Sequence, residues 1–121
     1  MEQNSAKKYD LEARTLSFAK EVRHFIKIVP KTLSNIEDAK QLVRSSGPIG
    51  ANYIEANESL GRKDFALRIK ICKKESKETI YWLRLIDCET VEERRKTLIQ
   101  EATELMKIFG AILQKYQVIT V

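Results

Sequence analysis

The stretch RSSGPIGANYIEANE, from Arg44 to Glu58, decides the fold. Its surroundings favour a long helix, and five small residues lie within it: Ser45, Ser46, Gly47, Gly50 and Ala51. Small residues on a helix let the backbone of a second helix approach closely. The stretch therefore predicts a packed crossing between two helices.

This stretch belongs to a predicted second helix over about residues 34–58, and Ser34 with Glu37 forms a capping box at its start. Pro48 removes one helical hydrogen bond and costs roughly 3 kcal/mol inside a helix. Two arrangements fit: a continuous helix kinked at Pro48, which we favour, and two shorter helices that abut there. The face expected to point inward contains Ile36, Ala39, Val43, Gly47, Gly50 and Ile54.

Three further helices are predicted around it. The first covers about residues 11–29, with Asp10 as its N-cap and Pro30 as its stop signal. Its inward stripe contains Leu11, Phe18, Val22, Phe25, Ile26 and Val29. Residues 1–9 are polar, and we expect them to form a disordered tail.

The third helix is predicted over about residues 62–86, after a break at Gly61. The fourth begins with a capping box formed by Thr90 and Glu93 and reaches about Tyr116. Its stripe contains Leu98, Ala102, Leu105, Phe109, Ile112, Leu113 and Tyr116. Connections this short make consecutive helices antiparallel neighbours. The expected fold is therefore all-α: an antiparallel up-down-up-down four-helix bundle that forms one domain over residues 10–121.

The composition limits the class of protein. The 121 residues are 43% apolar, which is enough for one hydrophobic core. No apolar run is long enough to span a membrane, and the opening MEQNSAKKYD lacks the apolar core of a signal peptide, so we expect a cytoplasmic location. The two cysteines, Cys72 and Cys88, form no C-x-x-C pair, and we expect both to be reduced, with Cys72 in the core.

The net charge of +5 comes from one segment. Residues 62–84 hold eight basic and three acidic residues, whereas the rest of the chain holds fourteen of each sign. At about 100° per residue, most of these basic residues fall on one arc of the third helix, which also carries Tyr81. We call this arc the basic stripe, and it contains Arg62, Lys63, Lys70, Lys73, Lys74, Lys77 and Arg84. Clustered basic residues beside an aromatic ring are typical of nucleic-acid binding, and the plainer interpretation is a solvated helix face.

The third helix also has two apolar faces. The one expected to point inward contains Phe65, Ile69, Cys72, Ser76, Ile80 and Leu83. Nearly opposite lies what we call the outer apolar face, which contains Leu67, Ile71, Trp82 and Leu85. A helix in a small bundle buries one face, so the second face predicts a partner, most simply another copy of the chain. The alternative is that Trp82 packs under the N-terminal tail.

The residues do not indicate an enzyme. Glu21 and His24 have the E-x-x-H spacing of di-iron bundles, but His24 is the single histidine and projects away from the apolar stripe of its helix. The glycines form no phosphate-binding motif. Glu55 and Glu58 are more simply ion partners of basic neighbours, and Arg44 is a candidate for that role. We therefore expect no catalytic residues, no cofactor and no metal.

Residues 44–86, RSSGPIGANYIEANESLGRKDFALRIKICKKESKETIYWLRLI, resemble the most characteristic region of a bacterial family of small four-helix-bundle proteins. The family includes proteins encoded within intervening sequences of 23S ribosomal RNA genes and the accessory variability proteins of diversity-generating retroelements. The motif R-S-S-G-x-x-G-A-N-Y-I-E-A carries the resemblance, which extends from YDLEARTLSFAK through the last helix. At Pro48 the chain departs from the family, where a small polar residue is commoner.

The resemblance implies a barrel-like homopentamer. In the retroelement branch it also implies binding of nucleic acid and of a reverse transcriptase through a basic surface. The positions that are often basic in the family correspond here to Arg62, Lys63, Lys70, Lys73, Lys74 and Lys77. For most members no activity is established.

Two hypotheses follow for the function. The first is a cytoplasmic, non-enzymatic homo-oligomer that binds RNA, or alternatively DNA, through the basic stripe. The second is a structural or adaptor protein whose outer apolar face and basic stripe bind a protein partner, such as a reverse transcriptase. A role at a membrane surface ranks third, because core and interface occupy the other faces of the helix.

Overall fold

The computed structural model describes the backbone of residues 2–120 and the side chains of residues 11–116. Its four α-helices are α1 (Glu2–Ile28), α2 (Leu33–Asn57), α3 (Arg62–Leu85) and α4 (Glu92–Thr120). A short 3₁₀ helix, η1 (Glu89–Val91), leads into α4. The described backbone contains no strand, so the expected all-α fold class is confirmed.

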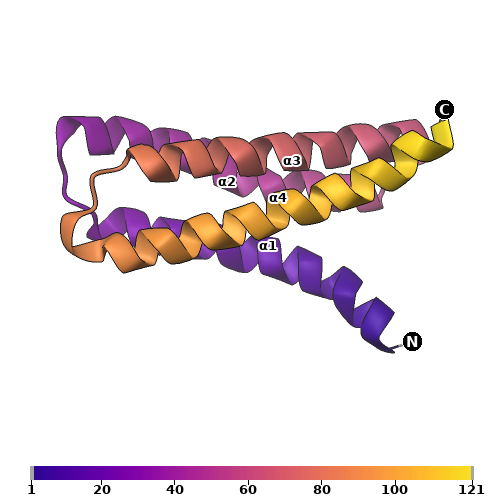
Figure 1. Ribbon diagram of the computed structural model, residues 1–121, viewed down its shortest axis with the longest axis horizontal. Helices are drawn as coiled ribbons and strands as arrows, with labels where there is room; N and C mark the ends of the chain where they lie inside the picture. Colours follow the sequence, from indigo (N-terminus) through magenta and orange to yellow (C-terminus); the bar gives the residue numbers. More distant parts are fainter. Residues whose placement is uncertain (1, 121) are drawn as a thin grey trace.

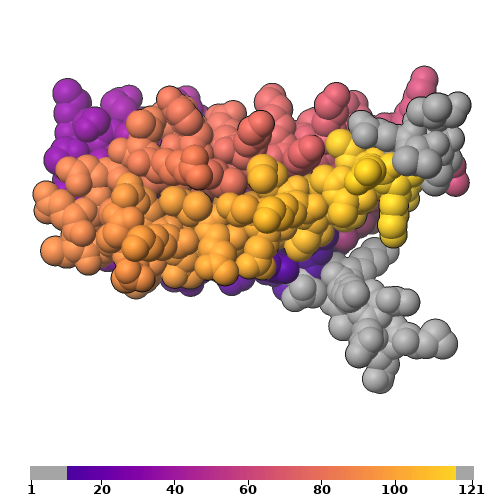
Figure 2. Space-filling view, viewed as in Figure 1, coloured from indigo at the N-terminus to yellow at the C-terminus, as the bar shows by residue number. Residues whose placement is uncertain are grey.

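Consecutive helices run in opposite directions along the molecule (Figure 1). Contacts are most extensive between α2 and α3 and between α3 and α4, whereas α1 touches α2 less and α4 least. In the space-filling view, α3 and α4 lie side by side along one face (Figure 2). One flank of α3 therefore faces α2 and the other faces α4.

The core confirms three of the four predicted inward faces. On α1 and α4 the expected stripes are buried, except that Ile26, Ile112 and Tyr116 are only half-buried. On α3 the expected face is buried apart from Phe65, which is half-buried and packs against the core. These stripes meet at the centre of the bundle, where Phe25 and Phe109 are the largest fully buried side chains.

The inward face predicted for α2 is wrong. Ile36, Val43 and Ile54 are exposed, with Ile54 at 51%. The helix is rotated so that a neighbouring stripe is buried instead, namely Asn35, Leu42, Ser45, Ser46, Ile49, Tyr53 and Ala56. Both stripes of α2 contain large apolar residues, so periodicity alone could not rank them. Ser45 can face inward because it is small and accepts a hydrogen bond from Thr79 of α3, at 2.9 Å. The hydroxyl of Ser46 is buried without a hydrogen-bond partner among the described residues.

The small-residue stretch does form a close crossing, between α2 and α1. A Cβ atom added at Gly50 would lie 2.7 Å from Thr15 Oγ1 and 3.1 Å from Thr15 Cβ. The two helices therefore touch at a point where a side chain on α2 would intrude. α2 is a single continuous helix across Pro48, as favoured from the sequence, and the kink stays a prediction.

The helix starts differ from the predicted caps. Thr32, not Ser34, caps α2, because its hydroxyl accepts the backbone N–H of Asn35. Thr90 lies within η1, and α4 begins only at Glu92. α1 begins at Glu2, so Asp10 lies inside the helix and is not its N-cap. The disordered tail expected over residues 1–9 stays a prediction, because Met1 and the side chains of residues 2–10 lie outside the described part.

Asn35 joins two loops and explains the position of the α2 cap. Its amide nitrogen donates to the carbonyls of Pro30, at 2.9 Å, and Asp87, at 2.8 Å. Its amide oxygen accepts the backbone N–H of Asp87 at 3.0 Å. One buried side chain thus links the α1–α2 loop to the end of α3. Buried polar groups need such partners, so Asn35 sets the register at which α2 begins.

The remaining expectations concern the cysteines and the membrane. Cys72 and Cys88 are free, and Cys72 is buried, as predicted; Cys88 is buried as well. Among the described helices, none has an apolar stretch long enough to cross a bilayer. The cytoplasmic location stays a prediction.

Candidate nucleic-acid interface

The packing of α3 determines where the basic stripe points. Its inward face is held against α2 by Cys72, whose thiol donates to the carbonyl of Ile49 at 3.4 Å, and by the bond between Thr79 and Ser45. Because this face is fixed, the helical period turns the other side of α3 outward. All seven residues of the basic stripe are exposed.

The charges of the basic stripe are not neutralised within the described part of the chain. None of its seven side chains forms an ion pair or a hydrogen bond with another described residue. Elsewhere basic residues do have partners: Arg14 pairs with Glu101 and Arg95 with Glu92. The stripe is therefore a local excess of positive charge that an external anion can approach.

Four lysines of the stripe line an open groove between α3 and α4, which we call the basic groove. Its volume is roughly 760 Å³. α3 contributes Lys70, Lys73, Lys74, Lys77, Glu78 and Tyr81, and α4 contributes Gly110, Leu113 and Gln114. Arg62, Lys63 and Arg84 lie nearer the ends of α3 and do not line the groove. The structure thus divides the predicted stripe into a central groove and separate ends.

Gly110 allows the lysine side chains to cross toward α4. A Cβ atom at this position would lie 3.7 Å from Cε and 3.9 Å from Nζ of Lys73. The aliphatic part of Lys73 therefore lies over the glycine, and its ammonium group is carried to the α4 side. Leu113 is buried and forms an apolar part of the lining. The α4 residues were not predicted as site residues, because no sequence pattern shows which turn of α4 faces the stripe.

Tyr81 sits at one end of the lysine row and is 57% exposed. Its ring makes an edge-on contact with the ring of Trp82, with centroids 5.0 Å apart and planes at 81°. Trp82 is half-buried, and its indole N–H donates to Glu78 at 3.3 Å. The exposed ring of Tyr81 thus lies beside the lysines and packs on Trp82, which is hydrogen-bonded to Glu78. The sequence had placed Tyr81 on the stripe, although it was not among the predicted site residues.

The outer apolar face is only partly open. Leu67 and Leu85 are exposed, at 55% and 49%, whereas Ile71 and Trp82 are half-buried. Trp82 packs against the core of its own bundle, so it offers less free surface than its size suggests. Packing of Trp82 under residues 1–9 involves side chains outside the described part. The role of this face as an oligomer interface stays a prediction.

A second apolar surface lies between α1 and α2. The exposed residues Ile36 and Val43 line a groove of roughly 310 Å³ together with Ile26, Val29 and Ala39. Its lining is almost entirely apolar. The groove is open because α2 buries its other stripe. From the sequence we had expected these residues to lie in the core.

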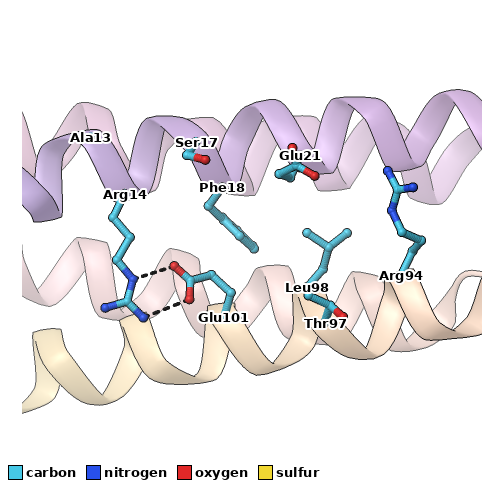
Figure 3. Close-up of a pocket in the computed structure, with 9 residues that line it drawn as sticks. All are labelled: Ala13, Arg14, Ser17, Phe18, Glu21, Arg94, Thr97, Leu98 and Glu101. Atoms are coloured by element: carbon cyan, nitrogen blue, oxygen red, sulfur yellow. Dashed lines mark hydrogen bonds and ion pairs between the residues drawn. The ribbon is translucent and has the colours of Figure 1, made fainter.

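Another groove, of roughly 690 Å³, separates α1 from α4 (Figure 3). Phe18 and Leu98 point into it from the two helices, and Arg14 forms two hydrogen bonds with Glu101, at 2.6 and 2.9 Å. The hydrogen bond to Glu101 raises the pKa of Arg14, so the guanidinium stays charged. The groove contains no predicted site residue.

The described structure shows no activated nucleophile at Cys72 or His24. Burial raises the pKa of the Cys72 thiol to about 12, so it stays protonated and unreactive. His24 is exposed, and its nearest acidic group is Glu21, whose Oε1 lies 3.7 Å from His24 Nδ1. Arg44 is also exposed and forms no ion pair with Glu55 or Glu58, so the ion-partner role considered for it is not realised.

Comparison with known proteins identifies the family. The model of the 23S rRNA-intervening sequence proteins matches residues 7–111. The chain belongs to this family. The match covers all four helices in part or whole and includes the basic stripe. It confirms the resemblance drawn from the motif at residues 44–56.

A solved structure supports the assignment to the 23S rRNA-intervening sequence proteins. It is the crystal structure of a protein of unknown function from the S23 ribosomal protein family of Bacteroides thetaiotaomicron. The two chains are 28% identical, with a TM-score of 0.73 over 85% of this chain and 97% of the other. A comparison with curated proteins found no match. Family membership therefore establishes the fold and leaves the activity to be argued from the site.

Proposed function

We propose that this protein is a non-enzymatic, homo-oligomeric helical bundle that binds nucleic acid, above all RNA, through its basic stripe. The observation that carries the proposal is the set of seven exposed basic side chains on α3 without acidic partners in the described chain. A solvated helix face usually intersperses both signs of charge, whereas here the acidic residues lie off the stripe. The groove collects four of the lysines within one concave surface.

The physical basis of binding is phosphate neutralisation. Each lysine or arginine that contacts a phosphate releases a condensed counterion, so affinity falls steeply as salt rises. Lysines are suited to this task as mobile point charges that need no particular base sequence. The proposal therefore predicts binding that is strong at low salt and weakly dependent on sequence.

The test uses the triple variant Lys70→Glu, Lys73→Glu and Lys77→Glu. Affinity for a labelled RNA is measured by fluorescence anisotropy over a range of salt concentrations. We expect weaker binding and a slope of log affinity against log salt that is flatter by about 2, since each lost phosphate contact removes about 0.7–0.9. Circular dichroism checks that helicity is retained.

A matched control carries the same change of net charge elsewhere. Lys20→Glu, Arg23→Glu and Lys27→Glu alter exposed basic residues of α1 with the same spacing along the helix, away from the basic groove and from the apolar groove. This control should bind nearly as well as the original protein. Equal affinity of the stripe variant and the original would refute the proposal, and equal loss in both triple variants would reduce it to an effect of net charge.

Self-association is supported by two separate apolar surfaces. The outer apolar face lies on α3, and the apolar groove lies between α1 and α2. Two different patches suit a head-to-tail contact between copies, and such contacts close into rings. A ring would also repeat the basic stripe around its surface and raise the local field. The family resemblance makes a pentamer the expected ring.

The second candidate function is an adaptor that binds a protein partner, such as a reverse transcriptase. The apolar groove between α1 and α2 favours it, since an apolar lining is more typical of protein contacts than of phosphate contacts. Purification from cells distinguishes the two. The ratio of absorbance at 260 and 280 nm shows whether nucleic acid co-purifies. A tightly held second protein without nucleic acid supports the adaptor function. Nucleic acid that high salt removes supports the first function.

A further inference from the structure

We propose that the basic groove takes single-stranded nucleic acid, with one base stacked on Tyr81 and the following phosphates along the lysines. This inference rests on the proposed function and names the class of ligand for the same site. The observations that carry it are the exposed, supported ring of Tyr81 and its position at the end of the lysine row.

The ring of Tyr81 is held in place before any ligand arrives. It is 57% exposed, so much of the side chain is open to a ligand. One side of the ring contacts Trp82 edge-on, and Trp82 is itself hydrogen-bonded to Glu78. A ring that is already ordered loses little conformational freedom on binding. Exposed aromatic rings of this kind form the platforms on which unpaired bases stack.

The lysines continue from the ring along one face of α3. Lys77 lies one helical turn from Tyr81, and Lys74, Lys73 and Lys70 follow over the next two turns. At 1.5 Å per residue, the row from Tyr81 to Lys70 covers roughly 16 Å. That length fits a base and the few phosphates that follow it in an extended strand. The strand would therefore run along the helix axis.

The other lining residues agree with an unpaired strand. Leu113 forms the buried apolar floor of the groove, and the exposed Gln114 has an amide that can donate to and accept from base edges. Glu78 is the only acidic residue among the lining side chains, and the indole N–H of Trp82 occupies its Oε2. The negative charge of Glu78 repels phosphates on the outer side of α3. The strand would therefore follow the side of the groove that faces α4.

A duplex cannot use this arrangement. Its base faces are stacked inside the helix, so Tyr81 would meet only the sugar-phosphate backbone. Duplex binding would then depend on the lysines alone. The two ligand classes therefore differ in one measurable respect, which is the contribution of the aromatic ring.

The test compares Tyr81→Ala with Tyr81→Phe, using a short unstructured RNA and a duplex of the same sequence at one salt concentration. Tyr81→Ala should lower affinity for the single strand about five- to a hundredfold, because stacking of one base is lost. Affinity for the duplex and the salt dependence should not change. Tyr81→Phe keeps the aromatic face and should bind the single strand as the original does. Tyr81→Leu keeps apolar bulk without that face and should behave as Tyr81→Ala.

The outcomes separate this inference from the proposed function. Binding that needs the lysines and is indifferent to Tyr81→Ala, or is weakened equally for both RNAs, overturns the stacking inference and leaves the proposed function standing. Binding indifferent to the lysine variant overturns both. Circular dichroism of each variant excludes a loss of fold as the cause.

Discussion

Gly50 shows how one missing side chain determines the distance between two helices. Thr15 of α1 approaches so closely that an added Cβ would lie 2.7 Å from its hydroxyl oxygen. Gly47 is one turn away on the same helix, and there the nearest atom, Arg23 Nη2, would be at 3.7 Å. The first distance is a clash and the second is ordinary contact. Two glycines of one motif therefore have different roles.

We expect Gly50→Ala to destabilise the protein by about 1–3 kcal/mol, since Thr15 or the whole of α1 must move. Gly47→Ala should stabilise it by about 0.5–1 kcal/mol, because alanine favours a helix and meets no obstacle. Urea unfolding followed by circular dichroism measures both. If Gly50→Ala is as stable as Gly47→Ala, the crossing is looser than the structure indicates.

At the scale of elements, α1 is the helix that is held least. It contacts its neighbours less than the other helices do, and Arg14 ties it to α4 by ion pairs. The guanidinium of Arg14 bonds Glu101 and also reaches Glu104, with 2.7 Å between Arg14 Nη2 and Glu104 Oε1. Two hydrogen bonds between one guanidinium and one carboxylate fix how the two side chains lie relative to each other. Local opening of the bundle should therefore begin at α1.

Arg14→Ala should increase hydrogen exchange at backbone amides of α1 and leave the central amides of α3 unchanged. The loss of a half-exposed ion pair costs about 1 kcal/mol, so α1 amides should exchange several-fold faster. Hydrogen exchange with mass spectrometry resolves the helices, and Lys20→Ala, on an exposed site of the same helix, is the control. Uniform acceleration in all four helices would show that α1 does not open independently.

At the scale of the whole molecule, one copy leaves large apolar side chains exposed on two surfaces. The outer apolar face and the groove between α1 and α2 lie on different helices, and both retain exposed leucine, isoleucine or valine. Exposed apolar patches commonly mark protein contacts. The exposed leucines of the outer apolar face, Leu67 and Leu85, do not line the basic groove, so changes at these two residues test assembly apart from nucleic-acid binding.

The double variant Leu67→Glu and Leu85→Glu should reduce the assembly to a single chain of 14.0 kDa, because it places charges within the outer apolar face. Light scattering after size-exclusion chromatography measures the mass. Ile28→Glu and Leu60→Glu change exposed residues outside both apolar surfaces and should leave the mass unaltered. A variant that keeps the mass of the original protein would exclude this face as an interface.

Much of the fold could be predicted from periodicity and turn residues. The start of α3 at Arg62 was predicted correctly because Gly61 interrupts the helical pattern there. The buried faces of α1 and α4 followed from single apolar stripes, and on α3 the more continuous of two apolar faces is the buried one. The cap of α2 was predicted two residues after its position, and α4 begins at Glu92, two residues after the predicted cap Thr90. In isolation Ser34 is, by a small margin, a better capping residue than Thr32. Asn35 decides between them, through bonds to a loop fifty-two residues away.

The sequence by itself determined the four helices, the concentration of positive charge on α3 and the family to which the chain belongs. These properties depend on residues close together along the chain, where helical spacing and capping act directly. Only the tertiary structure decided which stripe of α2 is buried, which turn of α4 completes the basic groove and how Trp82 supports Tyr81. Each of these depends on which surface a neighbouring helix covers, and burial is a property of that pairing and not of either helix alone.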